Sequence, residues 1–152
     1  MKNILFVCLG NICRSSLAEG ILRAELAKRG RADIMVDSAG TGNWHIGNAP
    51  DRRAIAVARQ NGIDISRQQA RQVRGDDFEN FDLIIAMDVD NLADLKAIAP
   101  FVNDDQLVIC GNFGTQATGA DVPDPYYGGD EGFQQVMTIL KDACNGIADH
   151  VT

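Results

Sequence analysis

Short apolar runs that alternate with segments of helical periodicity constrain the fold of this 152-residue chain more than any other feature. Four runs are typical of buried strands and span residues 2–7, 34–37, 81–87 and 106–110. Four segments have helical character: one from residue 15 or 16 to about 29, then 50–60, 91–99 and 131–147. Strands that alternate with helices predict one α/β domain over residues 1–152. Its four-stranded parallel sheet would carry helices on both faces and a phosphate-binding loop after the first strand.

Composition and charge exclude several classes of protein. Fourteen Lys and Arg against 21 Asp and Glu leave a net charge of −7, which disfavours nucleic acid as a partner. No apolar run approaches the ~20 residues that span a bilayer, and the first residues do not resemble a secretory signal. Four scattered cysteines are typical of reduced thiols, so a cytoplasmic protein without a membrane partner is expected.

A glycine-containing loop joins the first predicted strand to the first predicted helix. It reads Cys8-Leu9-Gly10-Asn11-Ile12-Cys13-Arg14-Ser15. Such a loop gathers unpaired N–H groups at the positive end of a helix dipole, which suits a phosphate. There the pKa of Cys8 should fall below the free value of about 8.5, and Arg14 can hold two phosphoryl oxygens. The spacing alone is weak, since Cys8 could also be an inert buried thiol and Arg14 a surface charge.

A proline-bracketed aspartate lies in the turn-rich stretch after the fourth predicted strand, within Val122-Pro123-Asp124-Pro125-Tyr126-Tyr127. Loops that follow parallel strands meet at one edge of the sheet, so Asp124 is expected near the first loop. A rigid, partly desolvated aspartate beside aromatic rings can serve as a general acid. Taken alone, the segment is better explained as an ordinary surface turn, in which Asp is common.

Together these motifs resemble the low-molecular-weight protein tyrosine phosphatases. The resemblance runs in order along nearly the whole chain, through Val7 to Ser15, Asp37-Ser38-Ala39-Gly40-Thr41, Ala70-Arg71-Gln72, Phe81-Asp82, Met87-Asp88 and Asp124-Pro125-Tyr126-Tyr127. It implies a metal-independent hydrolase without a cofactor that forms a phosphocysteine intermediate. The two histidines, His45 and His150, have no ligand partner at metal-site spacing.

The resemblance also implies a role for each matching residue. Cys8 would attack phosphorus, Arg14 would bind the phosphate in the transition state, and Asp124 would act as general acid and then general base. The phosphate-binding residues would be Leu9, Gly10, Asn11, Ile12, Cys13, Arg14 and Ser15. Ser15 would hydrogen-bond the thiolate, while Asn11 and Ser38 would hold the loop in shape.

Substrate preference would depend on the cavity rim. The resemblance places Tyr126 and Tyr127 there and makes Trp44 a candidate for the opposite side, although a lone Trp is as often a core residue. Ile12 fits the tyrosine phosphatases, whereas the related arginine phosphatases have Thr at that position. A tyrosine-phosphorylated protein is therefore the expected substrate, phosphate or vanadate should inhibit, and a monomer or weak dimer is expected.

The other cysteines divide into a redox role and packing roles. The resemblance implies that Cys13 forms a reversible disulfide with Cys8 under peroxide, which would protect Cys8 from irreversible oxidation. Cys110 and Cys144 lie on predicted strand and helix faces and are expected to pack in the core.

Two positions depart from the family pattern. Ser16 stands where the family usually has proline, and Ser16-Leu17-Ala18-Glu19 has the spacing of a capping box, so the helix could begin one residue later. Gln68 lies where many relatives have a histidine that supports the loop. It can form hydrogen bonds but cannot titrate.

Three rival functions fit parts of the pattern. A thiol-dependent arsenate reductase shares the fold but needs further redox cysteines, and none occurs between residues 14 and 109. A phosphocysteine carrier of the sugar phosphotransferase type has no use for Asp124 as a leaving-group acid. A module that only binds phosphotyrosine is expected to lack Cys8, Arg14 or Asp124, and all three are present.

Overall fold

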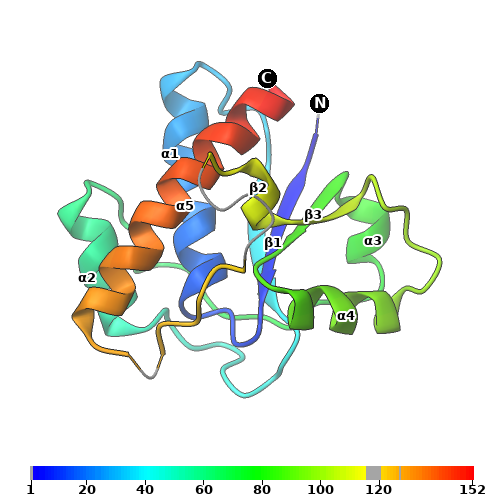
Figure 1. The fold of residues 1–152 in the computed structure, drawn as a ribbon, viewed down its shortest axis with the longest axis horizontal. Helices are drawn as coiled ribbons and strands as arrows, with labels where there is room; N and C mark the ends of the chain where they lie inside the picture. The colour runs from blue at the N-terminus through cyan, green and yellow to red at the C-terminus, as the bar shows by residue number, and fades with distance from the viewer. Residues whose placement is uncertain (1, 116–120, 127) are drawn as a thin grey trace.

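A sheet of four parallel strands lies at the centre of the molecule (Figure 1). The computed structural model describes residues 2–115, 121–126 and 128–152. The strands have the spatial order β2-β1-β3-β4 and are β1 (Ile4–Cys8), β2 (Val36–Gly40), β3 (Leu83–Ala86) and β4 (Leu107–Ile109). Since β1 pairs with β2 and β3, the loops after these three strands emerge side by side, at the end of the sheet away from both chain termini.

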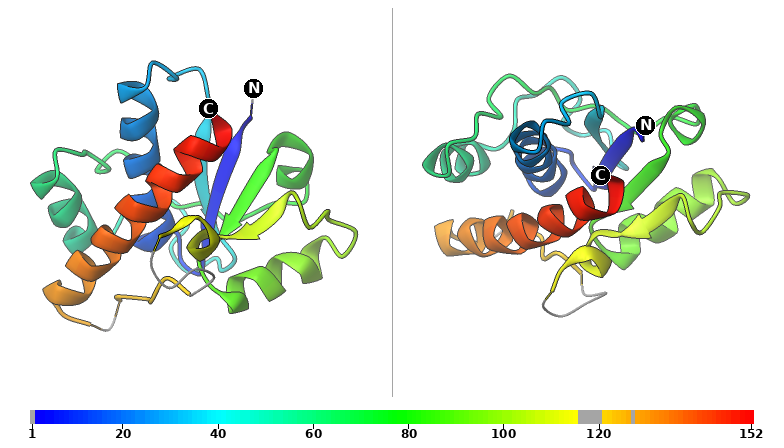
Figure 2. Two further views of the ribbon diagram at one scale, coloured as in Figure 1. Left: turned by 45° about the horizontal axis from the view of Figure 1, so that its top comes forward. Right: turned by 90° about the horizontal axis from the view of Figure 1, so that it is seen from above.

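Helices cover both faces of this sheet, as the sequence predicted (Figure 2). They are α1 (Arg14–Lys28), α2 (Arg52–Gln60), α3 (Asp77–Asn80), α4 (Val89–Ile98) and α5 (Asp130–Val151), and a 3₁₀ turn, η1 (Cys110–Phe113), follows β4. On one face α1 packs against α5, and α2 lies beside both. Residues from α3 and α4 line the core of the other face. No helix within the described ranges is both long and apolar enough to span a membrane.

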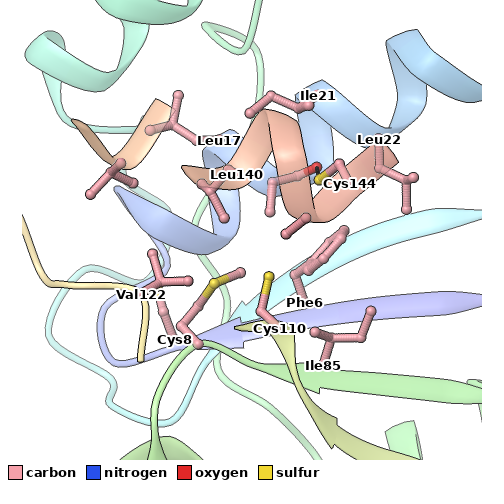
Figure 3. Close-up of a cluster of buried hydrophobic side chains, with 14 of the residues drawn as sticks. Phe6, Cys8, Leu17, Ile21, Leu22, Ile85, Cys110, Val122, Leu140 and Cys144 are labelled. Atoms are coloured by element: carbon pink, nitrogen blue, oxygen red, sulfur yellow. Dashed lines mark hydrogen bonds between the residues drawn. The ribbon is translucent and has the colours of Figure 1, made fainter. Parts of the chain in front are cut away.

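The central strand contributes to both cores because its side chains alternate between the two faces. Phe6 and Cys8 join the core beneath α1 and α5 (Figure 3), whereas Leu5 and Val7 join the core beneath α4. Every residue of β1 is buried, which is typical of a strand in the middle of a parallel sheet. The strand that ends at Cys8 is therefore held from four sides.

Several predicted boundaries need correction. The second predicted strand, residues 34–37, begins at Val36 and extends to Gly40, because Ser38, Ala39 and Gly40 also pair with β1. Helix α2 begins at Arg52, so Pro50 does not lie in its first turn; Asp51 caps the helix by accepting a hydrogen bond from the Arg53 N–H at 2.8 Å. Sequence analysis missed α3 and η1, which span only four residues each.

The start of α1 also differs from the predicted capping box. Helix α1 begins at Arg14, so Ser16 lies inside the first turn, and its hydroxyl donates to the Asn11 carbonyl at 2.9 Å. The Glu19 carboxylate accepts a hydrogen bond from Ser38 at 2.7 Å and caps no backbone N–H. Both side chains thus hold the loop before α1 and do not cap the helix.

Candidate active site

Most carbonyl groups of the loop between β1 and α1 accept hydrogen bonds from fixed partners and point away from its centre. Three of them accept hydrogen bonds of 2.9 Å from backbone N–H groups that lie after β2 and before α2. The Thr41 N–H donates to the Cys8 carbonyl, the Gly42 N–H to the Leu9 carbonyl, and the Asp51 N–H to the Ile12 carbonyl. The carbonyls of Asn11 and Cys13 accept hydrogen bonds from the Ser16 hydroxyl and the Leu17 N–H. A loop whose acceptors face outward leaves its donors facing inward.

Those donors give the loop the chemistry that an anion site requires. Within the described residues, the N–H groups of Gly10, Ile12 and Cys13 donate to no protein group. Asn11 has a φ of 57°, a conformation that turns the chain and is tolerated by Asn better than by most residues. Free N–H groups around one turn at a helix N-terminus are the arrangement that binds phosphate.

Cys8 lies at the base of this loop with 2% of its surface exposed. Its Sγ is 3.0 Å from the Ser15 Oγ and accepts from the Asn11 N–H at 3.3 Å. The Asn11 amide donates to the Ser15 Oγ at 2.8 Å, so the Ser15 proton is free to point toward the sulfur. Two donors therefore face Cys8, an arrangement that stabilises a thiolate.

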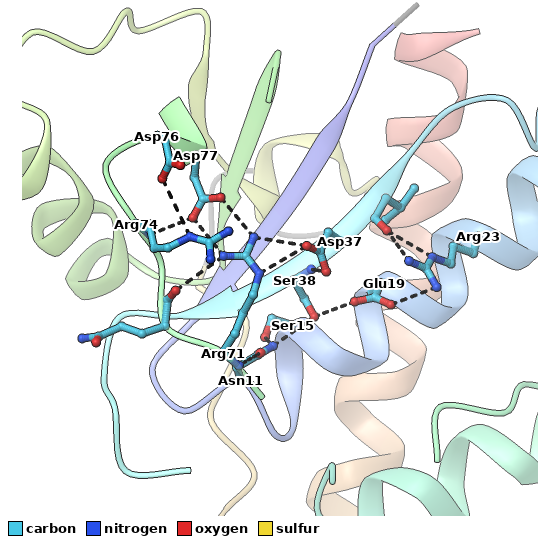
Figure 4. Close-up of polar contacts among 12 residues, drawn as sticks. Asn11, Ser15, Glu19, Arg23, Asp37, Ser38, Arg71, Arg74, Asp76 and Asp77 are labelled. Atoms are coloured by element: carbon cyan, nitrogen blue, oxygen red, sulfur yellow. Dashed lines mark hydrogen bonds and ion pairs between the residues drawn. The ribbon is translucent and has the colours of Figure 1, made fainter. Parts of the chain in front are cut away.

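A buried polar network holds the Asn11 side chain in place (Figure 4). Its amide also donates to the Ser38 Oγ at 3.0 Å, and Ser38 in turn donates to Glu19. The Asn11 Oδ1 accepts from the Arg71 N–H at 2.9 Å. Burial raises the pKa of Glu19 above its ordinary value, although the Ser38 hydrogen bond and Arg23 work in the opposite direction. All polar atoms of the Asn11 side chain are thus engaged, so the loop shape is specified.

Arg14 closes the loop from the first turn of α1, and its side chain is 3% exposed. The Arg14 Nη1 donates to the Asp88 carboxylate at 2.6 Å and to the Val122 carbonyl at 3.1 Å. Burial lowers the pKa of Arg14, but the charge of Cys8 and the contact with Asp88 outweigh this and raise the pKa. The guanidinium is therefore a permanent cation with a fixed orientation.

Asp124 lies across from Arg14, with its carboxylate 3.7 Å from the Arg14 Nη2. Its Oδ1 accepts from the Tyr126 N–H at 3.0 Å, which is a local turn contact. The side chain is 43% exposed, so the expected partial desolvation is modest in this structure. Asp124 can exchange protons with solvent and still reach the cavity.

One cavity of about 410 Å³ brings the predicted residues together. It is lined by Cys8, Leu9, Gly10, Ile12, Cys13, Arg14, Trp44, His45, Asp124 and Tyr126. Trp44 is 68% exposed, which excludes the core-packing alternative and places it on the rim with Tyr126. Tyr127 lies outside the described residues. His45 is a lining residue that sequence analysis did not select.

The remaining cysteines are free thiols in buried surroundings. Burial, together with Asp51 and Cys8, raises the pKa of Cys13, so this thiol keeps its proton at neutral pH. Burial raises the pKa of Cys110 to about 12. Cys110 and Cys144 have no exposed surface and pack between the sheet and α5, as expected (Figure 3).

The Gln68 side chain supports α1 rather than the loop network. Its Nε2 donates to the Ser16 carbonyl at 3.1 Å, and its buried Oε1 has no partner among the described residues. Glu19 and Arg71 provide the contacts around Ser38 and Asn11 described above. Gln68 thus acts as a hydrogen-bonding side chain, but its partner is the first turn of α1 and not the Asn11 network.

Comparison with known proteins identifies the family. The family model described as low molecular weight phosphotyrosine protein phosphatase matches residues 3–152. The chain belongs to this family. It is 44% identical over 145 residues to the low molecular weight protein-tyrosine-phosphatase YfkJ of Bacillus subtilis, covering 95% of this chain and 92% of that protein.

Solved structures of the phosphatase family share the fold. A protein tyrosine phosphatase from Entamoeba histolytica, with Hepes in its active site, superposes with a TM-score of 0.94 at 38% identity, covering 99% of this chain and 97% of that one. The Drosophila arginine phosphatase superposes with a TM-score of 0.91 at 32% identity, covering 100% and 98% of the two chains. The predicted α/β fold and the phosphatase family are both confirmed.

The phosphatase site also contains charged residues that sequence analysis did not assign. Asp88 orients Arg14, Glu19 and Arg71 fix Ser38 and Asn11, and none of them lies in the loop itself. Asp88 follows the β3 strand in the segment quoted for the resemblance, which is the one signal that could have found it. Within the described ranges, no three His, Cys, Asp or Glu side chains are grouped so as to hold a metal ion.

Proposed function

We propose that this phosphatase hydrolyses phosphotyrosine in proteins, and small aryl phosphates, through a phosphocysteine intermediate on Cys8. The observation that carries the proposal is the single cavity that Cys8, Arg14 and Asp124 line together. A nucleophile, a fixed cation and a carboxyl group at one cavity are the groups that phosphoryl transfer from an aryl ester requires.

In the first step, the Cys8 thiolate donates an electron pair to phosphorus while the bond from phosphorus to the phenolic oxygen breaks. The departing oxygen takes its proton from Asp124, which must begin the step as the neutral acid. Arg14 and the free N–H groups of the loop hold the three equatorial oxygens, whose charge is largest in the transition state.

In the second step, water attacks the phosphorus of the phosphocysteine and the sulfur leaves as a thiolate. The Asp124 carboxylate accepts the proton of the attacking water, which restores the acid for the next cycle. Ser15 and the Asn11 N–H donate to the departing sulfur, and this lowers the cost of expelling it. The raised pKa of Cys13 keeps that thiol protonated, so it does not compete with Cys8 as a nucleophile.

The cavity rim supports phosphotyrosine as the substrate. Leu9, Trp44 and Tyr126 are each more than a third exposed, although such apolar side chains are usually buried. They can stack on or pack against an aromatic ring held above Cys8. Ile12 gives the cavity an apolar wall, where the arginine phosphatases have a hydroxyl-bearing residue. Phosphoarginine is the second substrate to test.

Four measurements test the proposal. Purified protein should hydrolyse p-nitrophenyl phosphate and a phosphotyrosine peptide without metal, and chelators should change nothing. Cys8→Ser should abolish turnover, and Asp124→Ala should lower it about 10²–10⁴-fold. Vanadate and phosphate should compete with substrate. Full activity in Cys8→Ser, or faster turnover of a phosphoarginine peptide than of a phosphotyrosine peptide, would overturn the proposal.

The same variants separate the rival functions. In a phosphocysteine carrier, Asp124→Ala would leave the transfer of a phosphoryl group to Cys8 unchanged. An arsenate reductase would consume thiol reductant when arsenate is added. We further propose that the protein is cytoplasmic, since a reducing compartment keeps a catalytic thiol reduced. We also propose that it works as a monomer or weak dimer.

A further inference from the structure

The segment that carries Asp124 is bound to the body of the protein by hydrogen bonds at its start. At its start, the Val122 N–H donates to the Met87 carbonyl at 2.9 Å, and the Val122 carbonyl accepts from Arg14. At its end it leads into α5, whose N-cap Gly129 offers no side-chain hydrogen bond. Asp124 itself is exposed and contacts only Arg14 and the Tyr126 N–H among the contacts described above. Its position therefore depends on what holds the far side of the segment.

Arg53, on the first turn of α2, holds that far side. Its Nη2 donates to the Tyr126 carbonyl at 2.9 Å, and its Nη1 donates to the Gly128 carbonyl at 3.0 Å. The guanidinium carbon also lies 4.6 Å from the ring centre of Phe133 and 5.8 Å from that of Tyr126. A charged donor that binds two carbonyls and packs on two rings restrains both backbone and side chain.

Asp51 fixes the direction of the Arg53 side chain. Its two carboxylate oxygens accept from the Arg53 Nε at 3.1 Å and from Nη2 at 3.0 Å, which is a two-point contact. The Asp51 N–H donates to the Ile12 carbonyl of the phosphate loop. Asp51 and Arg53 thus form one rigid link between the loop that carries Cys8 and the segment that carries Asp124.

We propose that Arg53 is a positioning residue for Asp124: it sets the distance between the acid and the oxygen that leaves phosphorus. This inference rests on the proposed function, in which Asp124 protonates that oxygen. The carboxylate of Asp51, the two carbonyls and the two rings already occupy the Arg53 guanidinium, so it has little capacity to bind substrate. Proton transfer requires the acid within about 2.6–3.2 Å of the oxygen, and a displacement of about 1 Å can cost about 100-fold in rate.

The test uses leaving groups that need the acid to different degrees. Phenyl phosphate loses a basic phenolate that requires a proton, whereas 2,4-dinitrophenyl phosphate loses a phenolate that leaves without one. For Arg53→Met we expect kcat/KM to fall about 10–100-fold with phenyl phosphate and less than about 3-fold with dinitrophenyl phosphate. Arg52→Met is the matched control: Arg52 is the exposed neighbour on α2 with no hydrogen bond or ion pair among the described residues, and it should change neither substrate by more than about 2-fold.

Double variants separate the possible failures. Asp124→Ala should show the same preference for the better leaving group, and adding Arg53→Met to it should not increase that preference further. Equal losses on both substrates, or a preference that multiplies in the double variant, would overturn the role of Arg53 and leave the proposed function intact. An Asp124→Ala enzyme without any preference would instead overturn the proposed function. Should Arg53→Met not fold, Arg53→Lys carries the same test, because it keeps the charge but cannot form the two-point contact.

Discussion

The contact between Arg14 and Asp88 yields the most direct prediction about stability. Asp88 has two tasks: its Oδ2 pairs with Arg14 at 2.6 Å, and its Oδ1 caps α4 by accepting from the Asn91 N–H at 2.7 Å. Asp88→Ala removes both contacts. Asp88→Asn removes the charge and keeps a single oxygen, which can still cap the helix by accepting from the Asn91 N–H, but its NH₂ group then faces Arg14, where one donor meets another.

The burial of the pair sets the size of the effect. Breaking a buried ion pair costs about 3–5 kcal/mol because it leaves an uncompensated charge. Arg14 is 3% exposed but keeps its bond to Val122, and Asp88 is 18% exposed, so the lower end, about 3 kcal/mol, applies. Loss of the cap adds about 1 kcal/mol. We therefore expect a loss of about 4 kcal/mol for Asp88→Ala and about 3 kcal/mol for Asp88→Asn, which keeps the cap but loses the ion pair with Arg14.

Urea unfolding in phosphate-free buffer measures these values, because bound phosphate would stabilise the folded state through Arg14. Far-UV circular dichroism is the suitable signal, since the single Trp44 is 68% exposed and reports poorly on the core. In a chain of this size, 4 kcal/mol corresponds to a fall in Tm of about 8–16 °C. The matched control is Asp90→Ala, an exposed acidic residue in the same helical turn, which should cost less than about 0.5 kcal/mol. A loss of about 1 kcal/mol or less in Asp88→Ala would mean that only the cap matters, and would refute the reasoning.

Three further predictions concern packing, pH and oxidation. A Cβ at Gly146 would collide with a backbone carbonyl of η1, so Gly146→Ala should lower the free energy of unfolding by about 1–3 kcal/mol. Gly132→Ala, in the same helix, meets only ordinary contacts and should raise it by up to about 1 kcal/mol; equal effects of the two variants in thermal unfolding would contradict this. Because burial raises the pKa of Glu19, the folded state holds this proton more tightly than the unfolded chain, and stability from this group is lost as pH rises through the folded pKa. Glu19→Gln should therefore gain stability relative to wild type as pH rises above the ordinary pKa of a glutamate, and a relative loss in urea unfolding would exclude the explanation. After mild peroxide treatment, mass spectrometry should find a Cys8–Cys13 linked peptide; Cys8 as sulfinic or sulfonic acid without that peptide would argue against the disulfide.

The parts of the fold that follow from local periodicity could be predicted from sequence. The apolar run that ends at Cys8 and the helix after it determine where the phosphate loop lies, and the structure has both within one or two residues. The cavity collects Trp44, Asp124 and Tyr126 beside that loop because loops after parallel strands meet at one edge. Pattern and topology therefore suffice for the residues that face the cavity.

Contacts between distant charged residues could not be predicted in this way. Asp88 meets Arg14 across 74 positions of the chain, and Arg71 meets Asn11 across 60. A single aspartate or arginine carries no periodicity that indicates its partner. The capping-box prediction failed for the same reason, because the spacing of Ser16 and Glu19 is local whereas Ser38, the actual partner of Glu19, comes from another strand.

The central place of β1 has a mechanical consequence for how this phosphatase can adapt to different substrates. Its strand has a neighbour on each edge and a packed core on each face, so Cys8 cannot move unless the sheet itself deforms. The segment of Asp124 leads into α5; Asp124 and Tyr126 are exposed, and the Arg53 side chain holds the Tyr126 carbonyl in place. The nucleophile is thus the fixed point of the site, and any adjustment to the size or direction of a bound phosphoester must come from the side of the acid.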